Sequence, residues 1–82
     1  MYYTYVLQSL KNGRNYIGST EDLKKRVKEH NSGVGSVYTS SNRPFKLIYY
    51  EAYLIDENAR LREKRLKHYG QALSQLKRRV GL

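Results

Sequence analysis

Residues 15–30 read NYIGSTEDLKKRVKEH, in which a short strand-like piece runs directly into a basic helix. The aromatic and β-branched start predicts a strand over residues 15–19. Tyr16 and Gly18 share one face of that strand, because alternate residues point to the same side. An Asn-Gly pair just before it is a strong hairpin signal, so we expect an antiparallel partner strand on its N-terminal side.

The second half of the stretch predicts a helix that ends at about Asn31. Either Ser19 or Thr20 is placed to cap its N-terminus, and the first turn carries two acidic residues, as the helix dipole favours. The Ser32-Gly33 pair then ends the helix. The stretch is therefore predicted to be one continuous strand–cap–helix unit.

The remaining predicted elements are a first strand, a polar Gly/Ser-rich loop, a third strand and two helices, at residues 2–9, 32–44, 45–53, 57–69 and 71–80. The third strand shows little alternation, which indicates burial on both faces. Asp56 is predicted to cap the helix that follows it. The order β-β-α-β-α-α predicts an α+β fold, a small three-stranded sheet flanked by helices, in a single domain over residues 1–82.

The charge balance points to a polyanionic partner. Sixteen Lys and Arg against seven Asp and Glu give a net charge of +9, with a pI near 9.9. In so short a chain this favours nucleic acid over a membrane surface, since no helix pairs a basic face with a broad apolar one. There is no cysteine, and neither a leader sequence nor a membrane-spanning segment is recognisable, so we expect a cytoplasmic protein.

Two polar side chains fall in or beside the apolar stripe of the first helix, which Leu23 and Val27 define. His30 lies between these two in helical angle, and Arg26 lies at the edge of the stripe. Arg26 and His30 are four residues apart and so lie on the same face of the helix, where both can contact the same bound group. The alternative is a fraying last turn in which His30 touches only solvent.

Glu63 is likewise a polar side chain in an apolar stripe, because in the next helix it falls inside the stripe formed by Ala59 and Leu66. Burying a bare carboxylate is costly unless it is paired or binds a metal. Arg62 and Lys67 flank it, so a structural ion pair is one interpretation and a metal-binding carboxylate is the other. Tyrosine, arginine, histidine and one carboxylate are together the groups expected for metal-assisted phosphodiester hydrolysis.

With these residues in order, the sequence resembles the GIY-YIG nuclease domains, and most closely the small standalone bacterial proteins of the YhbQ type. The resemblance covers about residues 2 to 80. Its motifs are Tyr3-Thr4-Tyr5, Tyr16-Ile17-Gly18, Arg26 with His30, the run from Val37-Tyr38-Thr39 to Arg43-Pro44, Leu47 to Glu51, and Ala59 to Glu63 with Lys67. The chain departs from the family pattern at Tyr3-Thr4, where the family has Gly-Ile. The bulky Tyr3 is expected to narrow the substrate cleft.

The resemblance implies hydrolysis of nucleic-acid phosphodiester bonds with one divalent metal, Mg²⁺ or Mn²⁺, and no other cofactor. Glu63 would hold the metal, and Arg26 would stabilise the transition state. Tyr5 and Tyr16 would border the scissile phosphate. One tyrosine is the general base, or the tyrosines only orient the water and His30 is the base.

Nucleic acid is the expected partner, with DNA favoured over RNA and with structure favoured over base sequence, because nothing resembles a sequence-reading motif. The residues expected to contact it are Gly18, Ser19, Lys24, Lys25, Lys28, Thr39, Arg43 and Lys67. A different interpretation is a non-catalytic nucleic-acid-binding module, and another is a subunit that brings the site to a DNA repair or processing complex.

Overall fold

The computed structural model describes residues 1–34 and 37–82. Gly35 and Ser36 of the predicted loop, and the side chains of Val37 and Tyr38, lie outside the described residues. The elements, in chain order, are β1 (Tyr2–Ser9), β2 (Asn15–Thr20), α1 (Leu23–Ser32), α2 (Val37–Asn42), β3 (Phe45–Tyr53), α3 (Asp56–His68) and α4 (Gly70–Val80). The predicted α+β order is confirmed, with the short α2 added inside the segment predicted as a loop.

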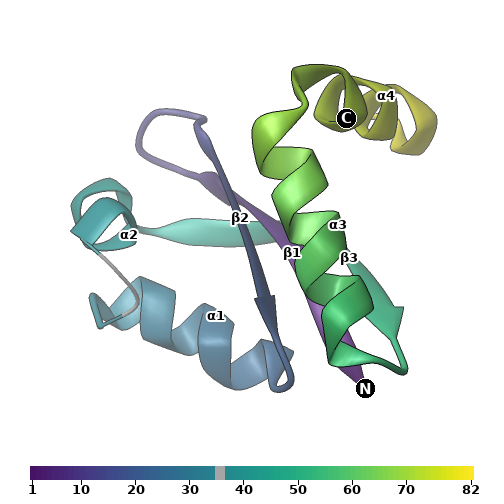
Figure 1. Ribbon diagram of the computed structural model, residues 1–82. Helices are drawn as coiled ribbons and strands as arrows, with labels where there is room; N and C mark the ends of the chain where they lie inside the picture. The colour runs from purple at the N-terminus through teal and green to yellow at the C-terminus, as the bar shows by residue number, and fades with distance from the viewer. Residues whose placement is uncertain (35–36) are drawn as a thin grey trace.

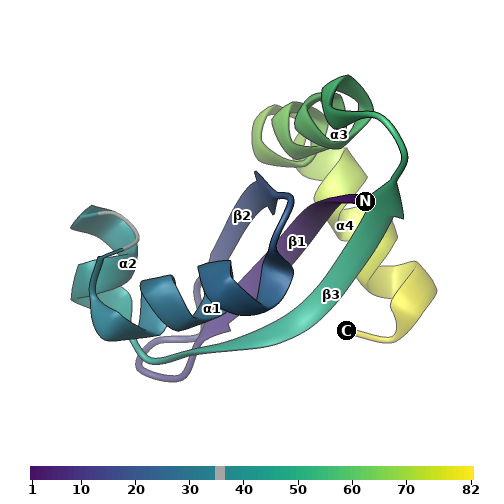
Figure 2. The same cartoon turned by 90° about the horizontal axis from the view of Figure 1, so that it is seen from below.

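The described part of the chain forms one three-stranded antiparallel sheet in the order β2-β1-β3. In its register Tyr5 lies opposite Gly18 of β2 and opposite Tyr50 of β3. The two ribbon views agree that α1 and α2 lie on one side of the sheet and α3 and α4 on the other (Figures 1 and 2). The hairpin predicted from the Asn-Gly pair is present, with Gly13 at a positive φ of 76° in the turn.

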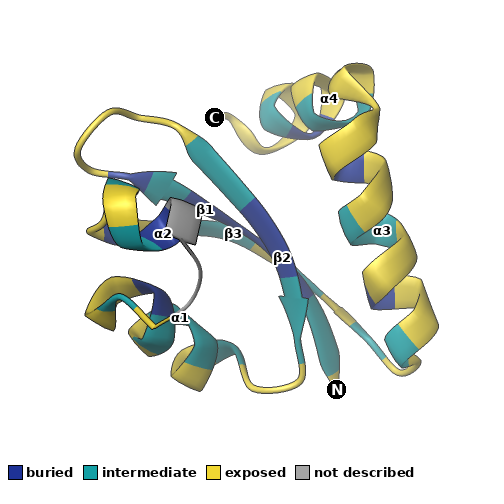
Figure 3. Ribbon diagram, turned by 60° about the vertical axis from the view of Figure 1, so that its left-hand side comes forward, coloured by how far each residue is buried: buried dark blue, intermediate teal, exposed yellow. Residues whose placement is uncertain are grey.

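Apolar residues form a cluster on each side of the sheet. Val6 and Ile17 pack against Leu66 of α3 and Leu76 of α4. On the other side, the buried side chains are Tyr5, Leu7 and Phe45, and the partly buried ones packed on them are Tyr16, Leu23 and Val27. The burial colouring shows the buried residues concentrated along the middle of the sheet (Figure 3).

The expectation that the third strand is buried on both faces is wrong. The strand buried on both faces is β1, in which each residue from Thr4 to Leu7 is buried. The reason is the strand order, because β1 is central whereas β3 is at an edge and is largely exposed or half-buried. A run of apolar and aromatic residues predicts a strand but does not tell a central strand from an edge one.

Both predicted helix caps are also wrong. At α1 the cap is Asp22, whose carboxylate accepts a hydrogen bond from the Lys25 backbone N–H at 3.1 Å. Thr20 still belongs to β2 and instead accepts from the Asp22 backbone N–H at 3.1 Å. At α3 the cap position is Ile55, which has no side-chain bond, and Asp56 lies in the first turn, where it pairs with Arg60 at 2.9 Å.

Gly18 is required by the packing of Tyr5 across the sheet. A Cβ atom built on Gly18 would overlap the Tyr5 hydroxyl and lie 2.6 Å from its Cζ atom. The glycine therefore makes room for a tyrosine ring of the same protein. The predicted contact of Gly18 with nucleic acid does not fit the structure, because Gly18 is buried beneath that ring. Among the described residues, no helix is long and apolar enough to cross a bilayer.

We expect Gly18→Ala to lower the free energy of unfolding by about 1–3 kcal/mol, because the added methyl forces the buried Tyr5 ring out of place. Gly70→Ala is the matched control: nothing lies within 4 Å of its Cβ position, and it begins a helix. That change should be neutral or slightly stabilising. Urea unfolding measures both variants, and equal stability of the two would contradict this explanation of Gly18.

Candidate active site

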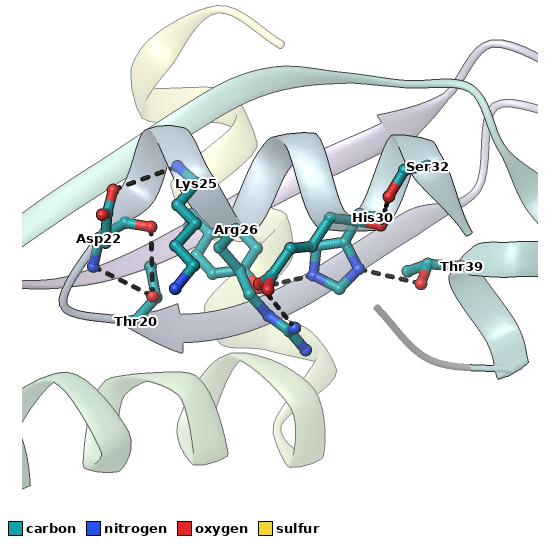
Figure 4. A network of polar contacts seen from close by, with 9 residues as sticks. Thr20, Asp22, Lys25, Arg26, His30, Ser32 and Thr39 are labelled. Carbon is teal, nitrogen blue, oxygen red and sulfur yellow. Dashed lines mark hydrogen bonds and ion pairs between the residues drawn. The ribbon is translucent and has the colours of Figure 1, made fainter. Parts of the chain in front are cut away.

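The five residues predicted as catalytic come from four elements and are joined by a chain of contacts. Tyr5 lies on β1, Tyr16 on β2, Arg26 and His30 on α1, and Glu63 on α3. The close-up view shows Arg26 and His30 on the same side of α1, next to β2 and facing toward α3 (Figure 4). The chain thus brings together side chains that are as much as 58 positions apart, at the edge of the sheet that β2 forms.

His30 is fully buried, and both of its ring nitrogens have partners. Nε2 lies 2.8 Å from the Tyr5 hydroxyl, and Nδ1 lies 2.9 Å from the Thr39 hydroxyl. Burial lowers the pKa of His30 from 6.5 to about 4; the positive charge of Arg26 adds to this and Glu29 opposes it. The imidazole is therefore neutral at pH 7. The alternative of a solvent-facing histidine in a fraying turn is wrong.

Tyr5 is almost completely buried, and burial raises the pKa of its hydroxyl to about 12, against the opposing effect of the hydrogen-bonded Arg26. A guanidinium can only donate, so the Tyr5 proton is left to point at Nε2 of His30. This assigns the histidine proton to Nδ1, which then donates to Thr39. The result is a directed chain from Tyr5 through His30 to Thr39.

Arg26 and Tyr16 complete the α1 side of the site. The Arg26 guanidinium forms an ion pair with Glu29 at 3.2 Å while its side chain stays 29% exposed, so it remains accessible to a ligand. The Tyr16 ring packs on His30, with centroids 4.8 Å apart and planes tilted by 60°. Tyr16 is only half-buried and is therefore the more accessible of the two tyrosines.

Glu63 enters the site from α3. Its Oε1 accepts a hydrogen bond from the Ser19 hydroxyl at 2.6 Å, and its Oε2 pairs with Lys67 Nζ at 2.6 Å. The Lys67 ammonium also lies 5.8 Å from the centre of the Tyr16 ring. Of the two basic neighbours expected to pair with Glu63, Lys67 does so, whereas Arg62 pairs with Glu51 of β3 at 2.7 Å.

The oxygen donors around Glu63 fit a divalent cation of the Mg²⁺ type. Mg²⁺ is commonly held by one or two carboxylates with several waters and substrate phosphates. Glu63 is 23% exposed, and the Ser19 hydroxyl fixes one of its oxygens, so Oε2 is the oxygen that can turn to an ion once Lys67 moves off it. Within the described residues, no group of three or more His, Cys, Asp or Glu residues is arranged to hold a metal.

Of the eight residues predicted to contact nucleic acid, five fall into two groups. Lys24, Lys25 and Lys28 are exposed on α1, and Lys67 and the half-buried Ser19 lie at Glu63. Thr39 does not fit the prediction, because it is fully buried against His30.

Arg43 is exposed, but it has a structural position at the C-terminal end of α1. Its guanidinium contacts the site where a Cβ would stand on Gly33, which is the left-handed cap residue with a φ of 90°. A cation beside the last carbonyls of a helix is favoured by the helix dipole. Arg43 thus supports the helix that carries Arg26 and His30.

Two residues of the site were missed from the sequence. Glu29 pairs with Arg26, and their i,i+3 spacing was the available signal. Thr4 donates a buried hydrogen bond to the Ala59 carbonyl at 2.7 Å and so ties β1 to the helix that carries Glu63. The position of Thr4 in a strand gave no sign of this bond.

The sequence matches the model of the GIY-YIG catalytic domain over residues 1–79, and the chain belongs to the GIY-YIG family, which is a family of nucleases acting on nucleic acid. This confirms the resemblance drawn from the two tyrosine triplets and the helix residues. Members of the family typically use a divalent metal.

Among similar proteins are small bacterial ones named UPF0213. The chain is 42% identical over 66 residues to a UPF0213 protein of Bacillus pumilus, covering 80% of this chain and 66% of that protein. It is 35% identical over 68 residues to one from Staphylococcus saprophyticus, covering 83% and 82%. The chain thus spans just under two-thirds of the Bacillus pumilus relative. A solution NMR structure of a UPF0213 protein from Bacillus halodurans aligns with a TM-score of 0.56 at 36% identity, covering 94% of this chain and 86% of that one.

The buried His30 predicts a specific loss of stability in acid. Its pKa is lower in the folded chain than the ordinary value of 6.5, so the folded state binds this proton less readily than the unfolded state. The stabilisation that the neutral His30 gives to the folded state is therefore complete above pH 6.5, and it is lost as the pH falls toward about 4. We expect the free energy of unfolding to decline across this window, as measured by urea titrations at a series of pH values.

The chain offers its other histidine as a matched control, because His68 is exposed at the end of α3. His68→Gln should keep the decline between pH 6.5 and about 4. His30→Gln should be less stable at pH 7 and should lose that part of the pH dependence. An unchanged decline in His30→Gln would show that other groups cause it.

Proposed function

We propose that this protein is a small endonuclease that hydrolyses phosphodiester bonds with Mg²⁺ or Mn²⁺. DNA is favoured over RNA as its substrate, and strand structure over base sequence. The observation that carries the proposal is the meeting of Arg26, His30 and Glu63 with two tyrosines at one sheet edge. The net charge of +9 supports a polyanionic substrate.

Glu63 is the residue that would hold the metal, with Ser19 keeping its carboxylate oriented. When bound, the ion supplies Lewis-acid stabilisation of negative charge on the phosphate and makes a bound water more acidic. Oε2 would hold the ion in place of its present partner, Lys67. An exposed i,i+4 ion pair is worth only about 0.3–0.5 kcal/mol, so losing it would cost little.

In this proposal, Arg26 stabilises the charge that develops on the phosphate. The Glu29 carboxylate and the Tyr5 hydroxyl hold its guanidinium, and the side chain remains accessible. A preorganised donor of this kind commonly contributes about 10²–10³ in rate. Glu29 therefore acts through Arg26 as a positioning residue.

The two tyrosines have different surroundings, which suggests different roles. The proton of Tyr5 points to a neutral His30, so the Tyr5 oxygen can take up a proton while its own proton moves to Nε2, and no tyrosinate forms, which a pKa of about 12 makes unfavourable at pH 7. The imidazolium formed at His30, whose pKa is about 4, then gives up a proton again at pH 7. Tyr16 is half-buried and can orient a water in the open part of the site. We therefore propose a Tyr5–His30 relay as the proton acceptor.

A second candidate is a nucleic-acid-binding module without catalysis, acting alone or within a repair or processing complex. Two observations favour it: Lys67 lies on the carboxylate oxygen that a metal would need, and Tyr3-Thr4 replaces the Gly-Ile of the family pattern. Neither removes a group that the proposed chemistry uses. The endonuclease therefore remains the better-supported function.

The deciding experiment compares Glu63→Gln with wild type in nicking assays on single-stranded and double-stranded DNA with Mg²⁺. Loss of the metal-holding carboxylate should lower the cleavage rate by about 10²-fold or more, while DNA binding persists. Glu57→Gln is the control, because Glu57 is exposed in the first turn of the same helix, away from the contacts of the site. Its rate should match that of the wild type.

Wild-type protein that binds DNA but shows no metal-dependent cleavage would support the binding module instead. Cleavage that survives in Glu63→Gln at the wild-type rate would exclude Glu63 as the metal-holding residue.

A further inference from the structure

A tyrosine-lined hollow lies on another flank of α1, and none of the residues proposed as catalytic lines it. It is a groove of about 600 Å³ between α1 and the β1 and β3 strands. Its apolar lining comes from Leu23 and Val27 of α1 and Leu47 of β3, and its aromatic lining from Tyr3 and Tyr50. This volume lies within the range of about 300–1,000 Å³ that small-molecule sites occupy.

The two tyrosines of the groove form an open aromatic surface. Their ring centroids are 5.9 Å apart and the ring planes are tilted by 66°, with Tyr50 53% exposed at the sheet edge. Tyr3 stands where the family pattern has glycine. The ring that we expect to narrow the substrate cleft lines this groove. A glycine there would leave the groove with one tyrosine.

Basic and acidic side chains both line the groove. Lys24 and Lys28 lie four residues apart on α1 and are exposed, and among the described residues neither has an ion-pair partner. Glu21 and Asp22 line the groove at the N-terminal end of the same helix, where Asp22 is already engaged as the helix cap. The lysines attract phosphates, whereas the two carboxylates repel them and can accept hydrogen bonds from base amino groups.

We propose that this groove binds one unstacked base of a single-stranded nucleic acid, with the flanking phosphates on Lys24 and Lys28. The proposal rests on the function proposed above and names the strand class that the protein binds. Aromatic surfaces beside a basic rim are the usual construction of single-strand sites, since every base can stack and duplex bases cannot enter. A second copy of this chain is a poorer occupant, because each copy carries a net charge of +9.

The test is the binding of 5′-fluorescein-labelled oligo(dC) of twelve nucleotides, followed by fluorescence anisotropy in EDTA so that no cleavage occurs. An abasic oligonucleotide of the same length and a twelve-base-pair duplex are the comparison probes. Tyr50→Ala should weaken oligo(dC) binding about five-fold or more, the effect of one lost stacking contact of about 1–3 kcal/mol. Its affinity for the abasic strand and the duplex should not change.

Tyr69→Ala is the matched control, because Tyr69 is a similarly exposed tyrosine outside the groove, between α3 and α4. It should bind all three probes as the wild type does. Lys24→Gln and Lys28→Gln should each weaken the binding of the oligo(dC) and the abasic strand alike and reduce the salt dependence. Circular dichroism of each variant verifies that it is folded.

Three outcomes would overturn the base-binding groove: no change in Tyr50→Ala, an equal loss on all three probes, or concentration-dependent self-association that Tyr50→Ala abolishes. Failure of the proposed function is distinguishable from these. If oligo(dC) binding depends on Tyr50 but no metal-dependent cleavage occurs, base binding in the groove is supported and endonuclease activity is rejected. If cleavage depends on Glu63 while Tyr50→Ala binds normally, the endonuclease stands and the groove does not.

Discussion

Tyr5 is the side chain on which the arrangement of the site depends. Its ring lies over Gly18 of the neighbouring strand, and its hydroxyl bonds to His30 of α1. It therefore joins three elements, since the strand that carries it is also the centre of the sheet. The same contact explains why a glycine is needed opposite it, and why the basic helix lies with Arg26 and His30 toward β2. Glu63 is then placed by the bonds that tie α3 to Thr4 and Ser19.

The order of the elements was predictable because strand alternation, the Asn-Gly turn and the helical periodicity are local signals. The same is true of the spacing of Arg26 and His30, and of the possibility that Lys67 pairs with Glu63. The caps and the burial of β3 were not predictable in the same way. Whether Thr20 or Asp22 caps α1 depends on the residue at which β2 ends. The exposure of β3 depends on which strand becomes central in the sheet.

The site residues show a similar division. Their types and spacings indicated a phosphodiesterase-like set, but not which group each would contact. In the sequence, Thr39 is one of several polar residues in a predicted loop. Only the fold shows that its hydroxyl is hydrogen-bonded to the imidazole of His30. The sequence predicts that Arg43 binds phosphate. Only the fold shows that its guanidinium lies at the C-terminal end of α1. Long-range partners of this kind are set by tertiary packing, which leaves no periodic trace in the sequence.

Of the ten residues of α1, all of which are described, His30 is the one that is buried. The helix that carries the proposed catalytic arginine is therefore held to the sheet by a polar, titratable residue of the same site, helped by two half-buried aliphatic side chains. Residues of an active site are often strained, so that exchanging a catalytic residue can raise stability while activity is lost. Under the proposed relay, anchoring and chemistry are assigned to one imidazole. Substitution at this position would then be constrained twice, because a better anchor would remove the proposed proton acceptor and a better base would loosen the helix.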